Sequence, residues 1–361
     1  MTAKTKKTIW IALLAAALIL LILIAAYFLW ERPPEIAETP AEPEPEEGEP
    51  AEIIVEAVPS PTPEPMPEGE AFETDRLDGV YTILLVGLDQ MSMSTDTIIV
   101  GKIDTKRHEM NFLSIPRDTI INVEWDVRKI NAVYSGSVLY GGTGVDSLSN
   151  HIRRIMGYVP DCYAVIDLNT FIEVVDLLGG VDFDVPSEVD YNFDDIEKGL
   201  HIHLDPGFQH LDGYGAMAVV RNREGYIWGD LDRIDVQHDF LKACADKMLS
   251  LGTVPNARKI VDLLDENLQT NLSAANIAWF MRQMLLCRSQ KIRFFTLPAE
   301  NHNIHGYSYA VPKIWEWIEM LNTYFNPFEQ ELGYGSLNIV YWDGKEYKAT
   351  VGLDGAWYYD D

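Results

Sequence analysis

The 361-residue chain is poor in cysteine and in basic residues, and each shortage excludes a class of protein. Its cysteines, Cys162, Cys244 and Cys287, lie far apart and form no CxxC pair. A zinc ribbon and a disulfide scaffold are therefore excluded, and ordinary buried thiols are expected. Only 28 Lys and Arg oppose 56 Asp and Glu, which gives a net charge of −28. Such an acidic surface repels phosphate backbones, so no nucleic-acid partner is expected.

One stretch, residues 9–30, contains no charged residue at all. Its 22 residues would span roughly 33 Å as a helix, enough to cross a hydrocarbon core. Lysines precede the stretch and glutamates follow it, so the positive-inside rule leaves residues 1–8 in the cytoplasm and the rest outside. A cleaved signal peptide is the competing interpretation, but the apolar run is too long and no A-x-A site follows. The sequence predicts a single-pass anchor in the bilayer, formed by Ile9 to Trp30.

Residues 31–78 contain 16 acidic and 2 basic residues and 11 of the 19 prolines. Few aromatic residues are available to bury, and the like charges repel one another, so a disordered, extended linker is expected.

Folded sequence is expected from residue 79. Strands are predicted at residues 81–88, 97–104, 109–115, 162–167 and 291–297. Helices are predicted at residues 146–156, 168–178, 212–220, 232–250, 257–265, 273–286 and 311–325. This order predicts an α/β fold with a mixed central sheet and helices on both faces. Residues 79–325 are expected to form the main domain, and residues 326–361 a small aromatic β extension with turns at residues 343–344 and 354–355.

Two aspartates bracket the loop after the first predicted strand: Asp89 follows that strand, and Asp96 lies seven residues on. Ligands gather at strand ends in α/β sheets, and two carboxylates can converge there on one divalent cation. Loop aspartates also commonly cap turns. Spacing alone leaves both interpretations open.

Basic residues stand near these aspartates or in later clusters. Arg117 follows a strand-ending proline, and Lys129 lies just downstream. In Arg221-Asn222-Arg223, residues two apart point the same way in an extended segment. A further helix start carries Asp230, Arg233 and Gln237; the last two are four apart and share a helix face. In so acidic a chain, these groups predict a local positive pocket suited to phosphate.

The segments YTILLVGLDQ, STDTIIVGKID, FLSIPRDT, VVRNRE and GDLDRIDVQHDFLKA, in this order, resemble the LytR-CpsA-Psr family. The resemblance covers roughly residues 79–250, and the anchor and linker before it match the usual layout of that family. It implies an extracellular phosphotransferase of a Gram-positive-type envelope. Such an enzyme moves a glycopolymer from an undecaprenyl-pyrophosphate carrier to a hydroxyl of peptidoglycan.

The resemblance also assigns roles to residues of this chain. Asp89 and Asp96 match the Mg²⁺-binding aspartates, and either can assist deprotonation of the attacking hydroxyl. The diphosphate-binding positions correspond to Arg117, Lys129, Arg221, Arg223, Asp230, Arg233 and Gln237, of which Arg117 and Arg221 also count with the two aspartates as catalytic residues. For the polyprenyl tail, the apolar faces at residues 171–178 and 240–251 are candidates, although such faces equally form core.

The sequence departs from the family pattern in two places. Ser94 stands where an arginine is common, and an Arg-Gln-Gln run appears here as Val236-Gln237-His238. Two alternatives stay open beside transfer. The same site could hydrolyse the lipid-linked diphosphate by passing the polymer to water, or the protein could be a catalytically weak scaffold that binds this lipid, which Ser94 and Val236 favour. Transcriptional regulation is disfavoured, because the folded part is expected outside the cell. The polymer, the acceptor position, the oligomeric state and the role of residues 326–361 stay open.

Overall fold

The computed structural model describes residues 32–36, 76–88, 94–139, 141–192, 199–222, 230–249, 256–287 and 289–353. Within this part of the chain, no helix is both long and apolar enough to cross a bilayer. The predicted span at residues 9–30 lies outside the described residues and stays a prediction, as does the expected disorder of most of the linker.

A six-stranded mixed sheet forms the centre of the fold, in the order β10-β3-β2-β1-β4-β9. Its strands are β1 (Val80–Leu88), β2 (Thr95–Asp104), β3 (Glu109–Ser114), β4 (Cys162–Asp167), β9 (Gln269–Thr270) and β10 (Ile292–Thr296). β1 pairs parallel to β4, and β3 parallel to β10, whereas β2 runs antiparallel to both of its neighbours. Hence β1, β3, β4 and β10 end at the same edge of the sheet, and β2 begins there.

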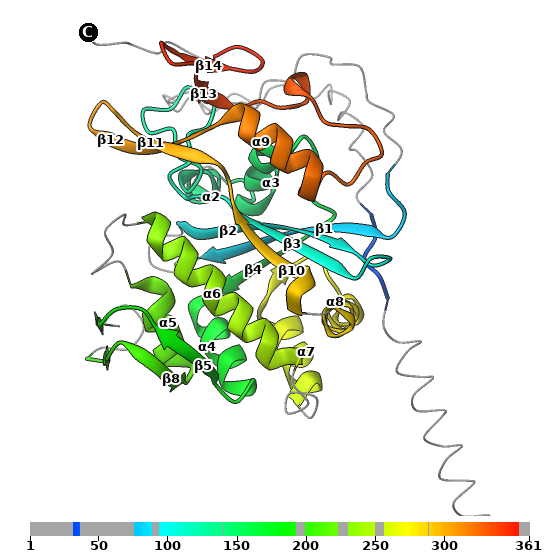
Figure 1. Cartoon of the computed structure of the whole chain (residues 1–361), viewed down its shortest axis with the longest axis vertical. Helices are drawn as coiled ribbons and strands as arrows, with labels where there is room; N and C mark the ends of the chain where they lie inside the picture. The colour runs from blue at the N-terminus through cyan, green and yellow to red at the C-terminus, as the bar shows by residue number, and fades with distance from the viewer. Residues whose placement is uncertain are drawn as a thin grey trace, which may run out of the picture.

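Helices cover both faces of this sheet (Figure 1). On one side lie α2 (Ala132–Leu139), α3 (Gly144–Met156) and α9 (Ile314–Met320), which a π-helical turn extends (Leu321–Phe325). On the other side lie α4 (Leu168–Leu177), α5 (Gly213–Arg221), α6 (Asp230–Leu249), α7 (Ala257–Asn267) and α8 (Ala274–Leu286). The predicted mixed α/β sheet with helices on both faces is confirmed.

The alternation of side chains along β1 explains the two cores. Leu84 and Val86 point into a cluster with α3 and α9, in which Trp317 and Phe325 are fully buried. Ile83, on the opposite face, packs in a second cluster under α6 and α8. This period of two is what a strand buried on both sides requires.

Short antiparallel pairs of strands lie outside the central sheet. They are β5 (Val181–Val185) with β8 (Gly207–Leu211), β6 (Val189–Asn192) with β7 (His201–Leu204), β11 (Ala299–Ile304) with β12 (Tyr307–Pro312), and β13 (Val340–Trp342) with β14 (Tyr347–Ala349). Two short 3-10 turns occupy Ser289–Lys291 and Tyr334–Ser336. The last pair confirms the predicted hairpin around residues 343–344, and the second predicted turn lies outside the described residues.

The prediction of one helix over residues 311–325 is wrong at its start. Val311 and Pro312 belong to β12, and α9 begins only at Ile314. A proline disfavours the helical conformation in the residue before it, so Val311 stays extended. The preceding turn, at His305 and Gly306, has positive φ at both residues, 51° and 83°, as type I′ hairpins require.

The residues after position 326 pack onto the same domain. Leu332, Leu337 and Ile339 join the core cluster of α3 and α9. Asn122 reaches this segment too, because its amide donates to Asn338 Oδ1 at 2.9 Å. All three cysteines are free; Cys162 and Cys287 are buried, and burial raises the pKa of Cys244 to about 12. The prediction of ordinary buried thiols is confirmed.

Candidate functional site

The candidate site lies at the edge where β1, β3, β4 and β10 end and β2 begins, called the site edge below. The antiparallel register sets Leu88 of β1 opposite Thr95 of β2, with an irregularity after Gly87. The loop between these strands therefore leaves and re-enters the sheet at one place. Asp96, the second residue of β2, is held at this edge by the strand pairing.

Asp96 forms an ion pair with Arg117 there. Arg117 Nη1 donates to Asp96 Oδ1 at 2.9 Å, and the two side chains are 21% and 26% exposed. The turn after β3 that carries Arg117 is braced on both sides. Thr119 donates through its N–H and its hydroxyl to the Pro116 carbonyl, and the Asn131 N–H donates to the Arg117 carbonyl at 3.1 Å. These bonds hold the turn so that a partly exposed guanidinium, a group suited to bidentate bonding of phosphate, lies beside the Asp96 carboxylate.

Arg233 approaches the same point from α6. Its side chain is buried, at 2% exposure, and Nη2 lies 3.5 Å from the backbone oxygen of Asp96, at the outer limit of a hydrogen bond. A buried guanidinium keeps its charge because its pKa is so high. Arg233 therefore supplies a fixed positive charge behind the start of β2.

Gln237 and Arg221 form the next part of the site. Gln237 Nε2 donates to the Val220 carbonyl at 3.1 Å, which ties α6 to the last turn of α5. Arg221 is the last residue of α5, and its guanidinium carbon lies 5.4 Å from the centre of the Tyr191 ring. A cation at a helix C-terminus is favourable in itself. The stacking on Tyr191 additionally fixes where this guanidinium lies.

Lys129 pairs with Asp118, the residue that follows Arg117. Its Nζ is 3.1 Å from Asp118 Oδ1 and 5.6 Å from the centre of the Tyr309 ring. The Ile130 N–H donates to the Thr119 carbonyl at 3.0 Å, so the segment that contains Lys129 lies beside the turn that carries Arg117. Lys129 therefore has its charge balanced locally by Asp118.

The structure thus brings together Asp96, Arg117 and Arg233 directly, with Arg221 and Gln237 connected through α6 and Lys129 beside Arg117. Asp89 and Arg223 lie outside the described residues, and so does the side chain of Asp230, which begins α6. Asp96 and Arg233 lie 137 positions apart along the chain, and they meet because α6 packs against the sheet.

A divalent cation would find oxygen donors of the right kind here. Carboxylate oxygen is the ligand type that Mg²⁺ prefers, and Asp96 offers it, partly exposed, at a strand end. Among the described residues, no group of three or more His, Cys, Asp or Glu could hold a metal. Asp96 therefore fits the predicted metal as one protein ligand, and the second predicted ligand, Asp89, lies outside the described part of the chain.

The departures from the family pattern have structural explanations at two positions. Val236 is 8% exposed and packs in the cluster around Phe240, so it lines the core. His238 shares a hydrogen bond of 2.7 Å between its Nε2 and Ser114 Oγ at the end of β3, and burial lowers the pKa of its ring. Ser94 lies directly before β2. A guanidinium group still reaches the start of this strand, because Arg233 approaches it from α6.

The apolar faces considered for the lipid tail are largely internal. Phe240 is fully buried, and its ring lies 6.0 Å from that of Phe171. Ile172 and Val175 of α4 belong to the same cluster. Within the described parts of residues 171–178 and 240–251, these side chains pack against each other as helix core.

Sequence reasoning missed several neighbours of the site. Thr95 is fully buried beside Asp96, and its Oγ1 has no hydrogen-bond partner among the described residues. Tyr191 and Tyr309 stack on Arg221 and Lys129 from elements that were not predicted. The position of Thr95 next to Asp96 was a usable signal, whereas nothing local connects either tyrosine with its cation.

Comparisons with known proteins find relatives of this chain. Polyisoprenyl-teichoic acid–peptidoglycan teichoic acid transferase TagV of Bacillus subtilis (strain 168) is 31% identical over 201 residues, which is 53% of this chain and 50% of TagV. The enzyme of the same description called TagU, from Oceanobacillus iheyensis, is 28% identical over 243 residues, 65% of this chain and 70% of that protein. The chain thus spans half the length of TagV and a larger share of TagU.

The fold is shared as well. The crystal structure of B. subtilis TagV superposes with a TM-score of 0.57 and 27% identity, covering 68% of this chain and 95% of that one. A model of the LytR_cpsA_psr family matches residues 58–325, well over half of the sequence. The chain belongs to the LytR_cpsA_psr family.

Proposed function

We propose that this protein is a membrane-anchored phosphotransferase that moves a glycopolymer from a polyprenyl-diphosphate carrier to a hydroxyl of peptidoglycan outside the cell. The observation that carries the proposal is the meeting of Asp96, Arg117 and buried Arg233 at one strand edge. Family membership and the teichoic acid transferases among the relatives support it. The anchor is the predicted span at residues 9–30.

The arginines and Lys129 bind the diphosphate. Planar guanidinium groups donate two parallel hydrogen bonds to phosphate oxygens, and such charge-assisted bonds are the strong ones. Arg117 is oriented by Asp96 and is partly exposed, so its guanidinium is accessible to an incoming phosphate. Arg221, fixed over Tyr191, and Arg233, fixed behind β2, then stabilise the charge that develops on the phosphorus oxygens.

The reaction is an in-line displacement at phosphorus. The hydroxyl oxygen of the acceptor bonds to the phosphorus that carries the polymer, and the bond to the carrier phosphate breaks. Polyprenyl phosphate leaves with that electron pair, and the proton of the hydroxyl passes to one carboxylate of the pair Asp89 and Asp96. Mg²⁺, held by these aspartates, would neutralise diphosphate charge and improve the leaving group. The residues of this chain position the diphosphate and balance its negative charge.

The test uses the full-length protein in lipid nanodiscs with lipid-linked polymer, Mg²⁺ and peptidoglycan oligomers, and identifies products by mass spectrometry. A phosphodiester-linked adduct supports transfer, and released polymer phosphate indicates hydrolysis instead. Asp96→Ala and Arg221→Ala should abolish most product, whereas Arg258→Ala, on exposed α7, should not. Tight lipid binding without either product would contradict an enzyme and favour a scaffold.

A further inference from the structure

The residues directly after the predicted membrane span are attached to the domain. The Arg32 N–H donates to the Ala275 carbonyl at 3.3 Å. Asn276 Nδ2 donates to the carbonyls of Arg32 and Pro33, at 3.0 Å each, and Pro34 is buried. Arg32 and Pro33 therefore lie against the first turn of α8.

The far end of the acidic segment is attached at a neighbouring point. Arg76 forms an ion pair with Asp161, whose side chain is completely buried at the start of β4. Asn271 Nδ2 donates to the Asp161 carbonyl at 3.3 Å. Asn271 precedes Asn276 by five residues, so the two attachment points lie close together along the chain. Residues 37–75 thus connect two points on the same side of the domain.

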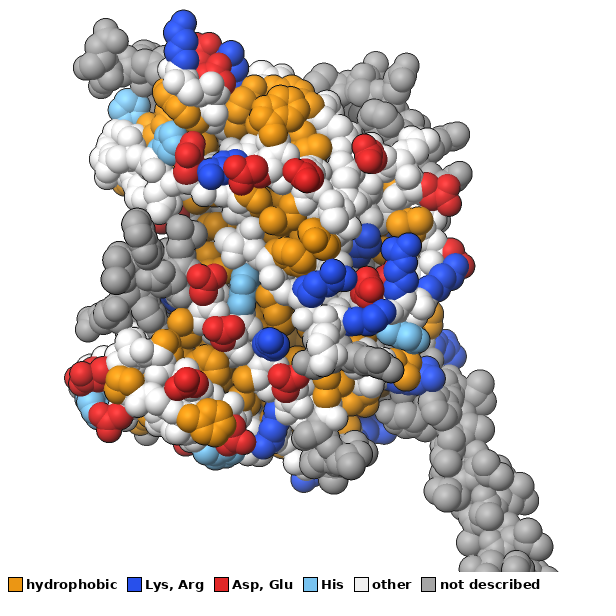
Figure 2. Space-filling view, in the orientation of Figure 1, with side chains coloured by type: hydrophobic (Ala, Val, Ile, Leu, Met, Phe, Trp, Pro, Cys, Tyr) orange, Lys and Arg blue, Asp and Glu red, His pale blue; other side chains and the backbone are white. Residues whose placement is uncertain are grey.

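This side also carries a group of basic residues, and together with the two attachment points it is called the basal edge below. It is where β1, β3, β4 and β10 begin and β2 ends. Its basic side chains are Lys102, Lys106, Arg107, Lys291 and Arg293. Lys106 and Arg107 are 61% and 74% exposed, and Figure 2 shows Lys and Arg gathered on the corresponding side of the molecule.

Acidic partners balance this group only in part. Among the described residues, Asp78, Asp104 and Glu109 pair with this group, which gives three carboxylates beside five basic side chains. One of the five, Lys102, is partly buried and donates to the Asn326 carbonyl at 2.7 Å. A local positive excess is notable in a chain of net charge −28. Lys and Arg side chains close to an anionic membrane surface are attracted to it. The charge of the basal edge therefore complements an anionic bilayer.

We propose that the basal edge faces the membrane and contacts anionic phospholipid headgroups, and that the attachments of residues 32–34 and of Arg76, rather than the length of chain between them, set the distance of the domain from the bilayer. The proposal rests on the predicted span at residues 9–30 and not on the transfer reaction. Within β1, Thr82 lies at the basal edge and Leu88 at the site edge. The two residues are about 20 Å apart at 3.3 Å per residue. The site then faces away from the bilayer, and the carrier chain of a lipid donor has to cover that distance.

The first test measures energy transfer from a labelled residue to an acceptor lipid, with the full-length chain in vesicles of anionic phosphatidylglycerol and zwitterionic phosphatidylcholine. One label is placed by Gln290→Cys, beside the basal edge, and the other by Lys345→Cys, on the β13–β14 turn. Transfer should be strong from residue 290 and weak from residue 345. Charge reversal at Lys106, Arg107 and Lys291 should cause loss of most of this difference. The same reversal at Arg258, Lys259 and Lys345 removes the site of the second label, so it is read from the 290 label alone, and energy transfer from residue 290 should stay unchanged. Equal transfer from both labels, or no effect of the basal reversal, would overturn the proposal.

The second test changes the length of chain between the two attachment points. Deleting residues 41–60, or duplicating them, should leave energy transfer from residue 290 unchanged, because both ends stay attached. A spacer would instead bring the domain nearer or move it away, and that result would overturn the proposal. Asn276→Ala should restore the length dependence. Ser273→Ala removes the α8 cap hydroxyl but not the contacts to Arg32 and Pro33, and should not restore it.

Binding of a soluble anionic polymer by the basal edge, without any change of energy transfer to the bilayer, would identify a different partner and reject the membrane assignment.

Discussion

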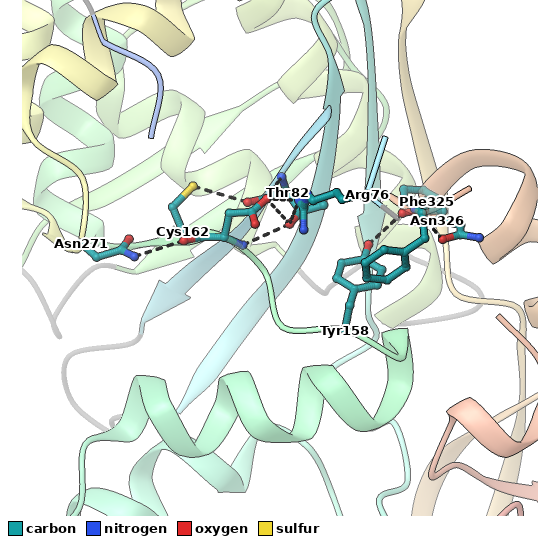
Figure 3. A network of polar contacts seen from close by, with 9 residues as sticks. Arg76, Thr82, Tyr158, Cys162, Asn271, Phe325 and Asn326 are labelled. Atoms are coloured by element: carbon teal, nitrogen blue, oxygen red, sulfur yellow. Dashed lines mark hydrogen bonds and ion pairs between the residues drawn. The ribbon is translucent and has the colours of Figure 1, made fainter. Parts of the chain in front are cut away.

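The two ends of the central sheet each carry an aspartate paired with an arginine, but the surroundings of the pairs differ. At the basal edge, Asp161 is completely buried and accepts from the Thr82 N–H at 2.7 Å and the Thr82 hydroxyl at 2.8 Å, besides Arg76 (Figure 3). At the site edge, Asp96 and Arg117 are 26% and 21% exposed. The first pair is enclosed by its partners, and the second is open to solvent.

The difference shows what burial does to the same chemistry. A buried ion pair with satisfied hydrogen bonds specifies one arrangement, and losing one partner leaves an uncompensated charge. A partly exposed pair contributes little to stability, because water screens it. Its members are therefore available to an anion or a cation. The basal pair is accordingly assigned to structure and the site pair to function.

The largest expected effect is on stability at the basal edge. Asp161→Ala leaves Arg76 without its counter-ion and should cost about 3–5 kcal/mol of unfolding free energy. Urea denaturation measures it, and Asp96→Ala, at the site edge, should cost no more than about 1 kcal/mol. Equal costs for the two variants would erase the distinction between the edges.

The next effect is on activity at the site edge. Asp96→Ala and Arg221→Ala should lower the rate of polymer transfer by about 10²-fold, as the removal of a charged group that stabilises the transition state does. Unfolding free energy should change by no more than about 1 kcal/mol. A variant that loses stability and activity in parallel would place its residue with the structural pair.

A smaller effect concerns pH. Burial lowers the pKa of His238, which bonds to Ser114 at the site edge. Below pH about 6.5 the unfolded chain takes up a proton that the folded ring resists, so stability should fall as the solution is acidified. Burial also lowers the pKa of His151, to about 4. The His238→Gln variant should therefore flatten the pH dependence between pH 6.5 and 5 only in part.

At the basal edge no such change is expected over this pH range, since burial raises the pKa values of Cys162 and Tyr158 and both stay neutral. A pH profile identical in His238→Gln and the parent protein would remove His238 from this account.

The smallest effect is expected at Lys129. Because Asp118 and Tyr309 already hold its ammonium group, Lys129→Ala should slow transfer by about tenfold or less. Steady-state kinetics with lipid-linked polymer measures this. A loss as large as that of Asp96→Ala would move Lys129 from the margin of the site into its centre.

Much of the sheet was predictable because its strands are short apolar runs with clear ends. β4 has the predicted bounds, and α4 and α5 begin at aspartates whose side chains accept from Thr170 N and Gly215 N. The peripheral hairpins were missed because they are short and half exposed, as β7 shows. Residues 311–312 differ from the predicted helix because Pro312 disfavours the helical conformation in Val311 and keeps it in β12.

The site was predictable as a set of motifs but not as an arrangement. Asp96 and Arg117 lie 21 residues apart, and only the pairing of β2 with β1 and β3 brings them together. Val236 shows the opposite failure, since the sequence places it beside Gln237 while the helix turns it into the core. Local pattern identifies charged residues, and long-range register decides which of them meet.

The central claim is that these scattered cations bind one lipid diphosphate at the site edge. The most direct test is calorimetric binding of a short-chain polyprenyl diphosphate and the matching monophosphate to the full-length protein, with Mg²⁺ present. The account predicts a clear preference for the diphosphate, and a loss of about tenfold or more in Arg117→Ala and in Arg221→Ala, with Arg258→Ala unchanged. Equal affinity for the two ligands, unaffected by either arginine, would contradict it.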